Sequence, residues 1–347
     1  MKKVNYSYII ACLTAILVLI ILIVFLFFEA TAPGLKLVID QDGGADDAIA
    51  VFMALLNEKY FNGFPVIALT TTHGNVDETQ TFNNTQKFLG IADRQDVPIY
   101  RGSNFSLLRD VPSDHYFGFD GLGDSETEFV DYKAIKPQPE HAAIALIELS
   151  KKFQGELIVL SLGALTNIAL AIKLDPGFIG RLSQLYVAAG NIYSEEYKEP
   201  EFNALIDVES YRIVLQNSRY DKVTVIPFSQ VLKSHNISAE WRKSVLGSIP
   251  TKVIKALNVF EQKSIVTSNT WNLLDPVAMA IVLNETEMIE ESLYVYNNIH
   301  ICENRGININ NFTATESINA RLIYKVREEP YKKMLIDIFS AELFSCL

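Results

Sequence analysis

From residue 35 onward, short runs of apolar and β-branched residues alternate with segments whose apolar residues recur at helical spacing. A strand pattern at 35–39, for example, is followed by a helical pattern at 46–57. This order predicts an α/β fold in one domain, residues 35–347, with a mostly parallel central sheet flanked by helices. The other predicted strands lie at 65–73, 156–162, 184–190, 222–228, 292–301 and 320–325, and the other helices at 77–90, 140–152, 165–174, 207–217, 239–267, 275–283 and 329–343.

The composition excludes several classes of protein. Of the 347 residues, 49% are hydrophobic and 20% are charged, which is typical of a chain with a large buried core and not of a disordered one. Only 3 cysteines are present, so a disulfide-dense scaffold is excluded. The net charge of −11 provides no broad basic face to neutralise phosphates, so we expect no nucleic-acid partner.

One segment near the N-terminus has a different character. Positions 8–28 are 21 consecutive uncharged residues, nearly all apolar. As a helix they would span about 31 Å, close to the thickness of the hydrocarbon core of a bilayer. Because two lysines precede them, the positive-inside rule predicts a cytoplasmic tail at 1–7, a transmembrane signal anchor at 8–28 and a linker at 29–34. The alternative is a signal peptide cleaved after residue 32, which would give a secreted protein.

This topology also predicts a compartment. A single-pass membrane protein with its N-terminus in the cytoplasm would hold the following domain on the lumenal or extracellular side. Cys302 and Cys346 are the only cysteines outside the anchor, and the sequence leaves open whether they form a disulfide or remain thiols. The expectation of a glycoprotein comes from five N-x-S/T motifs, which begin at Asn83, Asn104, Asn236, Asn284 and Asn311.

The first predicted strand leads into a dense acidic group, Asp40, Asp42, Asp46 and Asp47. Ligands of parallel α/β sheets bind beyond the carboxyl ends of the strands, so a site is expected here. Carboxylates this close repel one another unless a cation or protons neutralise them. Their oxygens are suitable ligands for Ca²⁺ or Mg²⁺, and no Cys or His is present to favour zinc.

Neither an EF-hand, nor a phosphatase motif, nor a helix cap accounts fully for the acidic group. An EF-hand loop beginning at Asp40 needs Gly at its sixth position and Glu at its twelfth, where this chain has Ala45 and Val51. A phosphatase of the haloacid dehalogenase type also carries D-x-D after a strand, but it has no use for the paired Asp46 and Asp47. The dipole at a helix N-terminus favours one or two acidic residues and not four.

This segment and several later ones resemble one enzyme family, the inosine-uridine preferring nucleoside hydrolases. Residues 40–48 match the family pattern D-x-D-x-G-x-D-D-A, with Gly43 where proline is more common. The later segments occur in the family's order, which makes coincidence a poor explanation. They are HGN at 73–75, P-I-Y-R-G at 98–102, DGLGD at 120–124, LTNIA at 165–169, EFN with a following Asp at 201–207, and D-P-x-A-x-A at 275–280.

The resemblance implies a nucleoside hydrolase fold and hydrolysis of the N-glycosidic bond of ribonucleosides to ribose and a free base. It implies one Ca²⁺ held by Asp42, Asp47, Asp275 and the main-chain carbonyl of Leu162. Asp42 would also be the catalytic base that takes a proton from the calcium-bound water. Asp40 would not bind the ion itself but would support the carboxylates that do.

The resemblance further implies how the ribose is bound. Asp46 would accept a hydrogen bond from a ribose hydroxyl, and Asn75, Glu201 and Asn203 would bind the remaining hydroxyls. The expected partner is therefore a small ribonucleoside, and a homo-oligomer is expected from the family alone.

Two positions depart from the family's pattern. A histidine that often precedes the late metal aspartate is replaced by Leu274, and a histidine before the DGLGD loop is replaced by Phe117. The group that activates the leaving base, and any purine or pyrimidine preference, therefore stay open. Phe117 and Trp271 are candidates for stacking on the base, with ordinary packing as the alternative. A second class of function also stays open, a membrane-tethered nucleoside- or ribose-binding protein with weak or no turnover.

Overall fold

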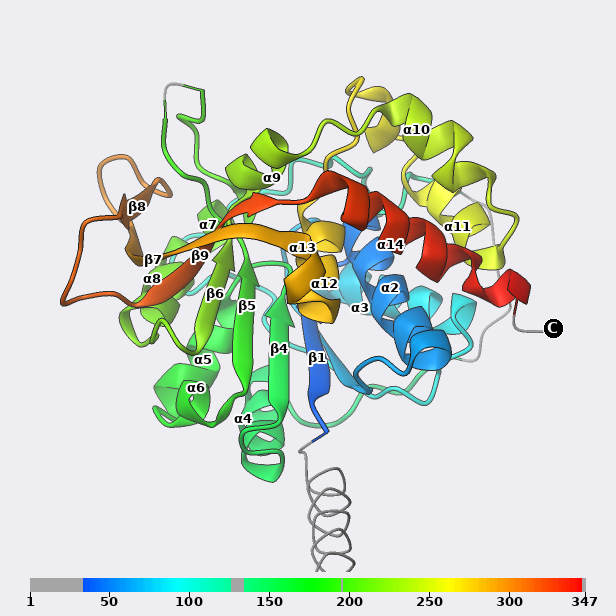
Figure 1. The fold of residues 1–347 in the computed structure, drawn as a ribbon. Helices are drawn as coiled ribbons and strands as arrows, with labels where there is room; N and C mark the ends of the chain where they lie inside the picture. Colours follow the sequence, from blue (N-terminus) through cyan, green and yellow to red (C-terminus); the bar gives the residue numbers. More distant parts are fainter. Residues whose placement is uncertain (1–33, 126–133, 195, 345–347) are drawn as a thin grey trace, which may run out of the picture. The chain divides into compact units, whose positions relative to one another are not determined.

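A nine-stranded sheet organises the unit Leu35–Leu347. The computed structural model describes residues 34–125, 134–194 and 196–344. The strand order is β3-β2-β1-β4-β5-β6-β9-β7-β8, parallel as far as β9 and antiparallel around β7 (Figure 1). The predicted mostly parallel α/β sheet is therefore confirmed. The strands are β1 (Lys36–Gln41), β2 (Val66–Thr71), β3 (Ile99–Tyr100), β4 (Leu157–Ser161), β5 (Gln184–Ala188), β6 (Val223–Ile226), β7 (Ile289–Ile299), β8 (Asn308–Asn311) and β9 (Ala320–Val326).

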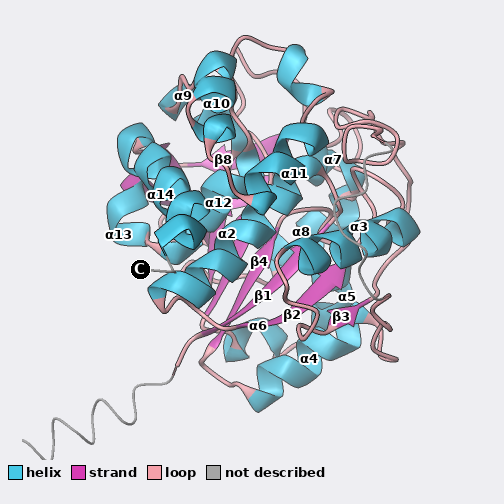
Figure 2. Cartoon of the chain, turned by 90° about the vertical axis from the view of Figure 1, so that its right-hand side faces the viewer, coloured by secondary structure: helices cyan, strands magenta, loops and turns pink. Residues whose placement is uncertain are grey.

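Helices cover both faces of the sheet, as predicted (Figures 1 and 2). Two separate clusters of buried apolar side chains, one on each face, show which helices belong together. One cluster joins the sheet to α2 (Ala45–Phe61), α3 (Glu78–Ile91), α11 (Lys252–Phe260), α12 (Leu274–Leu283) and α14 (Glu328–Ser340). The other joins it to α4 (Ala142–Lys152), α5 (Thr166–Leu174), α6 (Phe178–Arg181) and α8 (Val208–Gln216). Shorter helices connect these layers: α7 (Phe202–Ile206), α9 (Phe228–Ser234), α10 (Ala239–Ser244) and α13 (Glu285–Met288).

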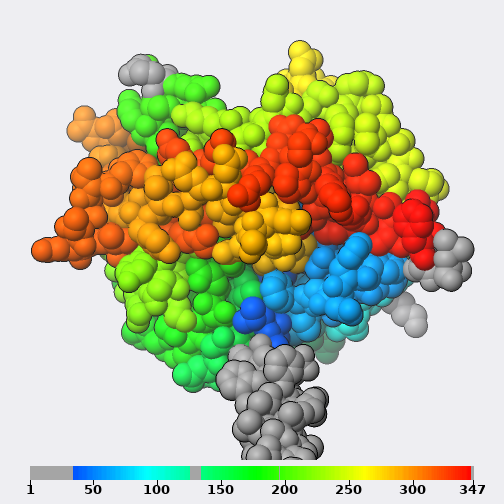
Figure 3. Space-filling model, in the orientation of Figure 1, coloured from blue at the N-terminus to red at the C-terminus, as the bar shows by residue number. Residues whose placement is uncertain are grey.

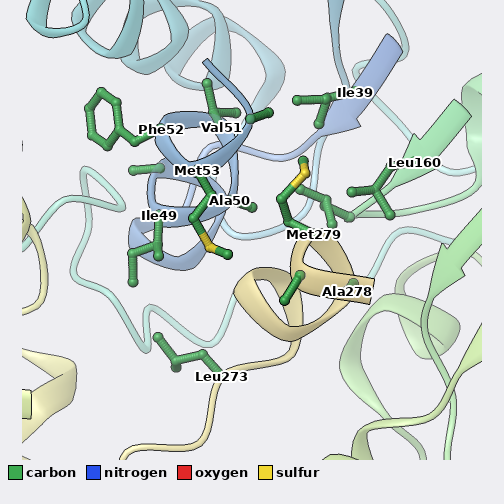
Figure 4. Close-up of a cluster of buried hydrophobic side chains, with 14 of the residues drawn as sticks. Ile39, Ile49, Ala50, Val51, Phe52, Met53, Leu160, Leu273, Ala278 and Met279 are labelled. Carbon is green, nitrogen blue, oxygen red and sulfur yellow. The ribbon is translucent and has the colours of Figure 1, made fainter. Parts of the chain in front are cut away.

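Strand β1 contributes to both cores because successive side chains of a strand point to opposite faces. Ile39 belongs to the cluster under α2 and α12, whereas Val38 belongs to the cluster on the other face. Figure 4 shows Met279 of α12 next to Leu160 of β4, with Phe52 of α2 in the same cluster. Each fully buried side chain of this size contributes about 1.5–3 kcal/mol, so β1 and α2 are held firmly.

The C-terminal helix completes the layer over α2. Helix α14 contacts α2 directly, and Figure 3 shows it (red) above the N-terminal segment (blue) on this face. The contact joins segments from the two ends of the described chain, so α2 and the turn that precedes it are covered on both sides.

The clearest difference from the predicted elements lies at 239–267, where the sequence pattern suggested continuous helix. The structure breaks this stretch into α10 and α11, each followed by a short 3₁₀ turn. Gly247 and Pro250 lie in the interruption, and both residue types disfavour a helix interior. The elements β8, α6, α7, α9 and α13 were not expected from the sequence, because each is too short to show a period.

The chain order of the strands reverses at β1. From β1 the chain proceeds to β2 and β3 on one side and then returns to β4 on the other side. In sheets of this kind the crevice that binds ligands lies at such a switch point, beyond the carboxyl ends of the two strands. The residues after β1 and β4 are the acidic group and Leu162.

The predicted single-pass membrane protein is corrected here. In residues 34–125, 134–194 and 196–344, no helix is long and apolar enough to cross a bilayer. The longest helix there, α2, has 17 residues and most of them are buried in the core. The segment 8–28, on which the prediction rested, lies outside these residues, so neither membrane attachment nor a lumenal location is retained.

The predicted homo-oligomer is likewise unsupported. Cys302 is exposed and free, and Cys346 lies outside the described residues.

Candidate active site

The acidic loop after β1 forms a tight turn that leads directly into α2. Gly43 has a φ of 84°, a left-handed conformation that favours glycine. The carboxylate of Asp47, in the first turn of α2, accepts hydrogen bonds from the backbone N–H groups of Gly44 at 2.7 Å and Asp42 at 3.2 Å. These bonds satisfy donors that a helix start would otherwise leave free. Asp47 therefore holds the loop in shape as well as contributing charge.

Three carboxylates meet at the carboxyl edge of the sheet. One oxygen each from Asp46, Asp47 and Asp275 lies within 4.8 Å of the others, although Asp275 comes from the start of α12. Burial raises the pKa of Asp46 to about 8 and raises the pKa values of Asp47 and Asp275 well above the usual range, and mutual repulsion adds to each rise. A hard divalent cation would relieve both costs, so the donor set fits such an ion.

Asp42 is fully buried beside this group. Its two side-chain oxygens accept hydrogen bonds from Asn75, from the side-chain amide at 2.7 Å and from the backbone N–H at 3.0 Å. A Cβ at Gly74 would overlap the Asp42 carboxylate, so the glycine of the HGN segment is needed for this close approach. Burial raises the pKa of Asp42 while the bonds from Asn75 oppose the rise. Asp42 is not one of the three carboxylates within 4.8 Å of one another.

Asp40 lies behind the acidic loop at the end of β1. Its Oδ1 accepts hydrogen bonds from Thr70 Oγ1 at 2.6 Å and from Asn167 Nδ2 at 2.8 Å, whereas its Oδ2 is buried without a partner among the described residues. Burial raises the pKa of Asp40 to about 6. Asn167, from the LTNIA segment, also donates to the carbonyl of Thr71 and so ties β1, β2 and α5 together. The sequence identified this segment as a motif without assigning Asn167 a role.

The EFN segment builds the opposite side of the site. Glu201 caps α7 by accepting from the backbone N–H groups of Asn203 at 2.9 Å and Ala204 at 2.9 Å, and it also accepts from Gly190 at 2.6 Å. Burial raises the pKa of Glu201. Asn203 Nδ2 donates to the carbonyls of Leu162 at 2.7 Å and Ala188 at 3.0 Å. The ends of β4, β5 and α7 are thereby fixed to one another.

A cavity of about 460 Å³ opens above these residues. Asp40, Asp42 and Asp47 are fully buried and do not line it. The other predicted site residues do line it, and this part of the lining is called the inner end below: Asp46, Asn75, Leu162, Glu201, Asn203 and Asp275. All the residues predicted for metal, base and ribose are therefore brought to one place, either on the wall of the cavity or directly behind it.

The rest of the lining, called the outer end below, combines aromatic and aliphatic side chains with a polar and charged group, Asp114, Asn191, Glu196, Lys198, Glu199 and Asn272. Phe117 and Leu274, the two positions that depart from the family pattern, both lie there. Trp271, the other candidate for stacking on the base, does not line the cavity. Its indole N–H donates instead to the carboxylate of Glu261. Sequence reasoning missed most of this end, including Tyr116, Tyr197, Phe228 and Leu232, which no motif distinguishes from ordinary apolar positions.

The chain is also similar to proteins that are already known. The family model described as inosine-uridine preferring nucleoside hydrolase matches residues 37–333. A curated relative, probable uridine nucleosidase 2 from Arabidopsis thaliana, is 38% identical over 159 residues, which is 45% of this chain and 47% of the relative. The inosine-uridine preferring nucleoside hydrolase of Leishmania major is 26% identical over 294 residues, 82% of this chain and 90% of that protein.

A solved structure described as a plant nucleoside hydrolase, the PpNRh1 enzyme, is also similar. It has a TM-score of 0.79 and 25% identity, and the match covers 89% of this chain and 100% of that one. Against several of the curated relatives it matches, including the one from Arabidopsis thaliana, the chain spans only about half of the relative's length.

Proposed function

The chain belongs to the inosine-uridine preferring nucleoside hydrolase family, and on that premise we propose that it is an enzyme that hydrolyses the N-glycosidic bond of ribonucleosides to ribose and a free base. The observation that carries the proposal is the group of Asp46, Asp47 and Asp275, which lies beside the buried Asp42 at the inner end of a 460 Å³ cavity. A cavity of this volume is within the usual range for small-molecule sites.

We propose that the cation is Ca²⁺, held by Asp42, Asp47, Asp275 and the carbonyl of Leu162. The set contains only oxygen donors, which is the preference of this ion. Asp46 belongs to the same group of carboxylates, so it is available to the cation as well as to a ribose hydroxyl. When bound, the ion would lower the pKa of a water molecule and neutralise charge near the reacting carbon.

Asp42 is the proposed catalytic base. It would take a proton from the attacking water while the bond between the anomeric carbon and the base breaks, and the departing base would receive a proton from solvent or from a group still to be identified. The two hydrogen bonds from Asn75 support this role, because they fix the orientation of the carboxylate. Asp40 would stabilise the end of β1, on which Asp42 depends.

The ribose is proposed to lie against Asp46, Asn75, Glu201 and Asn203. All four line the inner end of the cavity, and their oxygen and amide groups match the hydroxyl groups of a sugar. Charge that develops on the sugar ring during bond breakage would be stabilised by Asp46 and Glu201. The sequence-based alternative, a binding protein with weak or no turnover, is not favoured by any of these contacts.

A direct test is to incubate the full chain with inosine, guanosine, adenosine, uridine and cytidine and to measure free base by chromatography. We expect base release that requires added Ca²⁺ and stops after EDTA treatment. Release of base from none of these nucleosides at saturating Ca²⁺ would contradict the proposed activity. Release that continues unchanged in EDTA would contradict the role of the metal while leaving the hydrolase activity in place.

A further inference from the structure

A buried ion pair lies outside the site described above. The side chains of Arg242, in α10, and Glu261, directly after α11, are only 3% and 2% exposed. This pair is more deeply buried than the other ion pairs that the structure places between described residues. Burying two charges costs free energy that their attraction does not reliably recover, so such pairs are often kept for the geometry they impose.

The pair has a third member, Trp271. The indole N–H of Trp271 donates to Oε1 of Glu261, while Nε of Arg242 donates to Oε2 of Glu261 at 2.8 Å. The guanidinium of Arg242 also lies 5.8 Å from the centre of the Trp271 ring and donates to Asn258 at 2.8 Å. Both carboxylate oxygens of Glu261 are therefore occupied, and the position of the indole is fixed from two directions.

Trp271 begins the short segment 271–273 that leads into α12. Its backbone N–H donates to the carbonyl of Ile237 at 2.7 Å, so main chain and side chain are both anchored. Leu273 and Leu274, two and three residues later, line the cavity, and the next residue is Asp275 of the carboxylate group. A shift of Trp271 would be passed on to the cavity wall and to that carboxylate, because only Asn272 separates Trp271 from Leu273 and Asn272 also lines the cavity.

From these contacts we infer that Glu261, Arg242 and Trp271 form a clamp. The clamp positions the outer wall of the cavity and the carboxylate of Asp275. Glu261 is thus a positioning residue that acts through Trp271 and does not touch the ligand. The expected changes in kcat and KM rest on the proposed function. The expected change in the Ca²⁺ Kd does not, because Ca²⁺ binding can be measured without a substrate.

The test compares Trp271→Phe and Glu261→Gln with the unaltered full chain. Trp271→Phe removes the indole N–H and keeps an aromatic ring, whereas Glu261→Gln keeps the shape of the side chain and removes its charge. Asp175→Asn is the matched control, because Asp175 pairs with Arg181 in α6, on the other face of the sheet. Three quantities are measured for each protein: the Tm, the Kd for Ca²⁺ by calorimetry, and kcat and KM at saturating Ca²⁺.

We expect both clamp variants to weaken Ca²⁺ binding by about tenfold, which is the scale of one misplaced ligand contact. KM should also rise, while Asp175→Asn lowers the Tm and leaves Ca²⁺ binding and kinetics unchanged. Clamp variants that lower the Tm but keep the Ca²⁺ Kd, kcat and KM of the unaltered chain would overturn the inference. If the unaltered chain hydrolyses no ribonucleoside, the proposed function fails, and the Ca²⁺ comparison still decides whether the clamp exists.

If Glu261→Gln does not fold, Trp271→Phe decides the question, because it leaves the Arg242–Glu261 pair intact. A further check is the double variant. A clamp that acts as a unit predicts that the double variant, compared with the unaltered chain, raises the Ca²⁺ Kd by much less than the product of the two single effects. Fully multiplicative effects would mean that the two residues act separately, and the clamp would be rejected.

Discussion

The two ends of the cavity are built in different ways. The inner end consists of carboxylates and amides whose positions are fixed by hydrogen bonds, such as those of Asn75 to Asp42 and of Asn203 to Leu162. The outer end includes rings and aliphatic side chains such as Phe117, Phe228 and Leu274, which are held by packing. The comparison indicates that chemistry and metal binding depend on the inner end, whereas the choice of base depends on the outer end.

The strongest test of this division is Asp42→Asn at the inner end. The change keeps the size of the side chain and removes the ability to take a proton. We expect kcat to fall on the order of 10³-fold or more, because general base catalysis commonly contributes 10²–10⁴-fold and a ligand to the cation is altered as well. Asp221→Asn, the same change at an exposed ion pair with Arg219, should leave kcat unchanged. Activity of Asp42→Asn near that of the unaltered chain would remove Asp42 from the role of base.

The second test removes the metal. Folded-state pKa values of about 6 for Asp40 and about 8 for Asp46 exceed the ordinary value of 3.8, so the metal-free folded protein holds more protons than the unfolded chain. The stability that these extra protons contribute is fully present below pH 3.8 and is lost as the pH rises to about 6 for Asp40 and to about 8 for Asp46. We therefore expect the Tm in EDTA to fall between pH 5 and pH 8.

Calcium should reverse this loss, because a bound cation replaces the protons. At a free concentration 100 times the Kd it would stabilise the fold by about 2.7 kcal/mol. Differential scanning fluorimetry in EDTA and in CaCl₂ across this pH range measures both effects. A Tm that is the same with and without Ca²⁺ at pH 8 would contradict the proposed metal site. His235 has the opposite effect at the acidic end of this range, because burial lowers its pKa to about 4 and its neutral form therefore loses stability on acidification between about 6.5 and 4. The comparison is decided between pH 6.5 and pH 8, where His235 no longer contributes.

The contrast between the two ends also explains what could be predicted from the sequence. Asp40 to Asp47 are contiguous and follow a strand, so their convergence is fixed by the topology of the sheet. Asp275 and Asn203 are distant in sequence and were found through the resemblance alone. Phe228 and Leu232 were not found, because apolar residues on a short helix are indistinguishable from core residues until the fold brings them to a cavity.

Trp271 was the one candidate for stacking on the base that the structure turns away from the cavity. A tryptophan near a predicted site suggests an aromatic platform, but its ring can also be held by a buried partner elsewhere. Glu261 is ten residues earlier, and Arg242 reaches it because the stretch at 239–267 breaks into α10 and α11. The pattern of the sequence favoured continuous helix there, so this contact could not be anticipated.

The outer end should respond to substitution differently from the inner end. Leu274→Ala removes part of the wall without touching a carboxylate, so we expect KM to rise by about tenfold, on the scale of a few lost methylene contacts. The Kd for Ca²⁺ should not change. Asn75→Ala is the counterpart at the inner end, where we expect kcat to fall more than KM rises. An equal loss of Ca²⁺ affinity in both variants would mean that the two ends are not separable.

The smallest effect is expected for the hydroxyl of Tyr116. It lies 3.4 Å from Thr267 Oγ1, too far for a strong hydrogen bond between two hydroxyls. Burial raises the pKa of Tyr116, so the group stays neutral. Tyr116→Phe should therefore change kcat/KM by no more than about threefold, which corresponds to about 0.65 kcal/mol. Tyr116→Ala removes the ring and should raise KM clearly. If Tyr116→Phe instead lowers kcat as much as Tyr116→Ala does, the hydroxyl takes part in the reaction, and the outer end contributes to chemistry as well as to the choice of base.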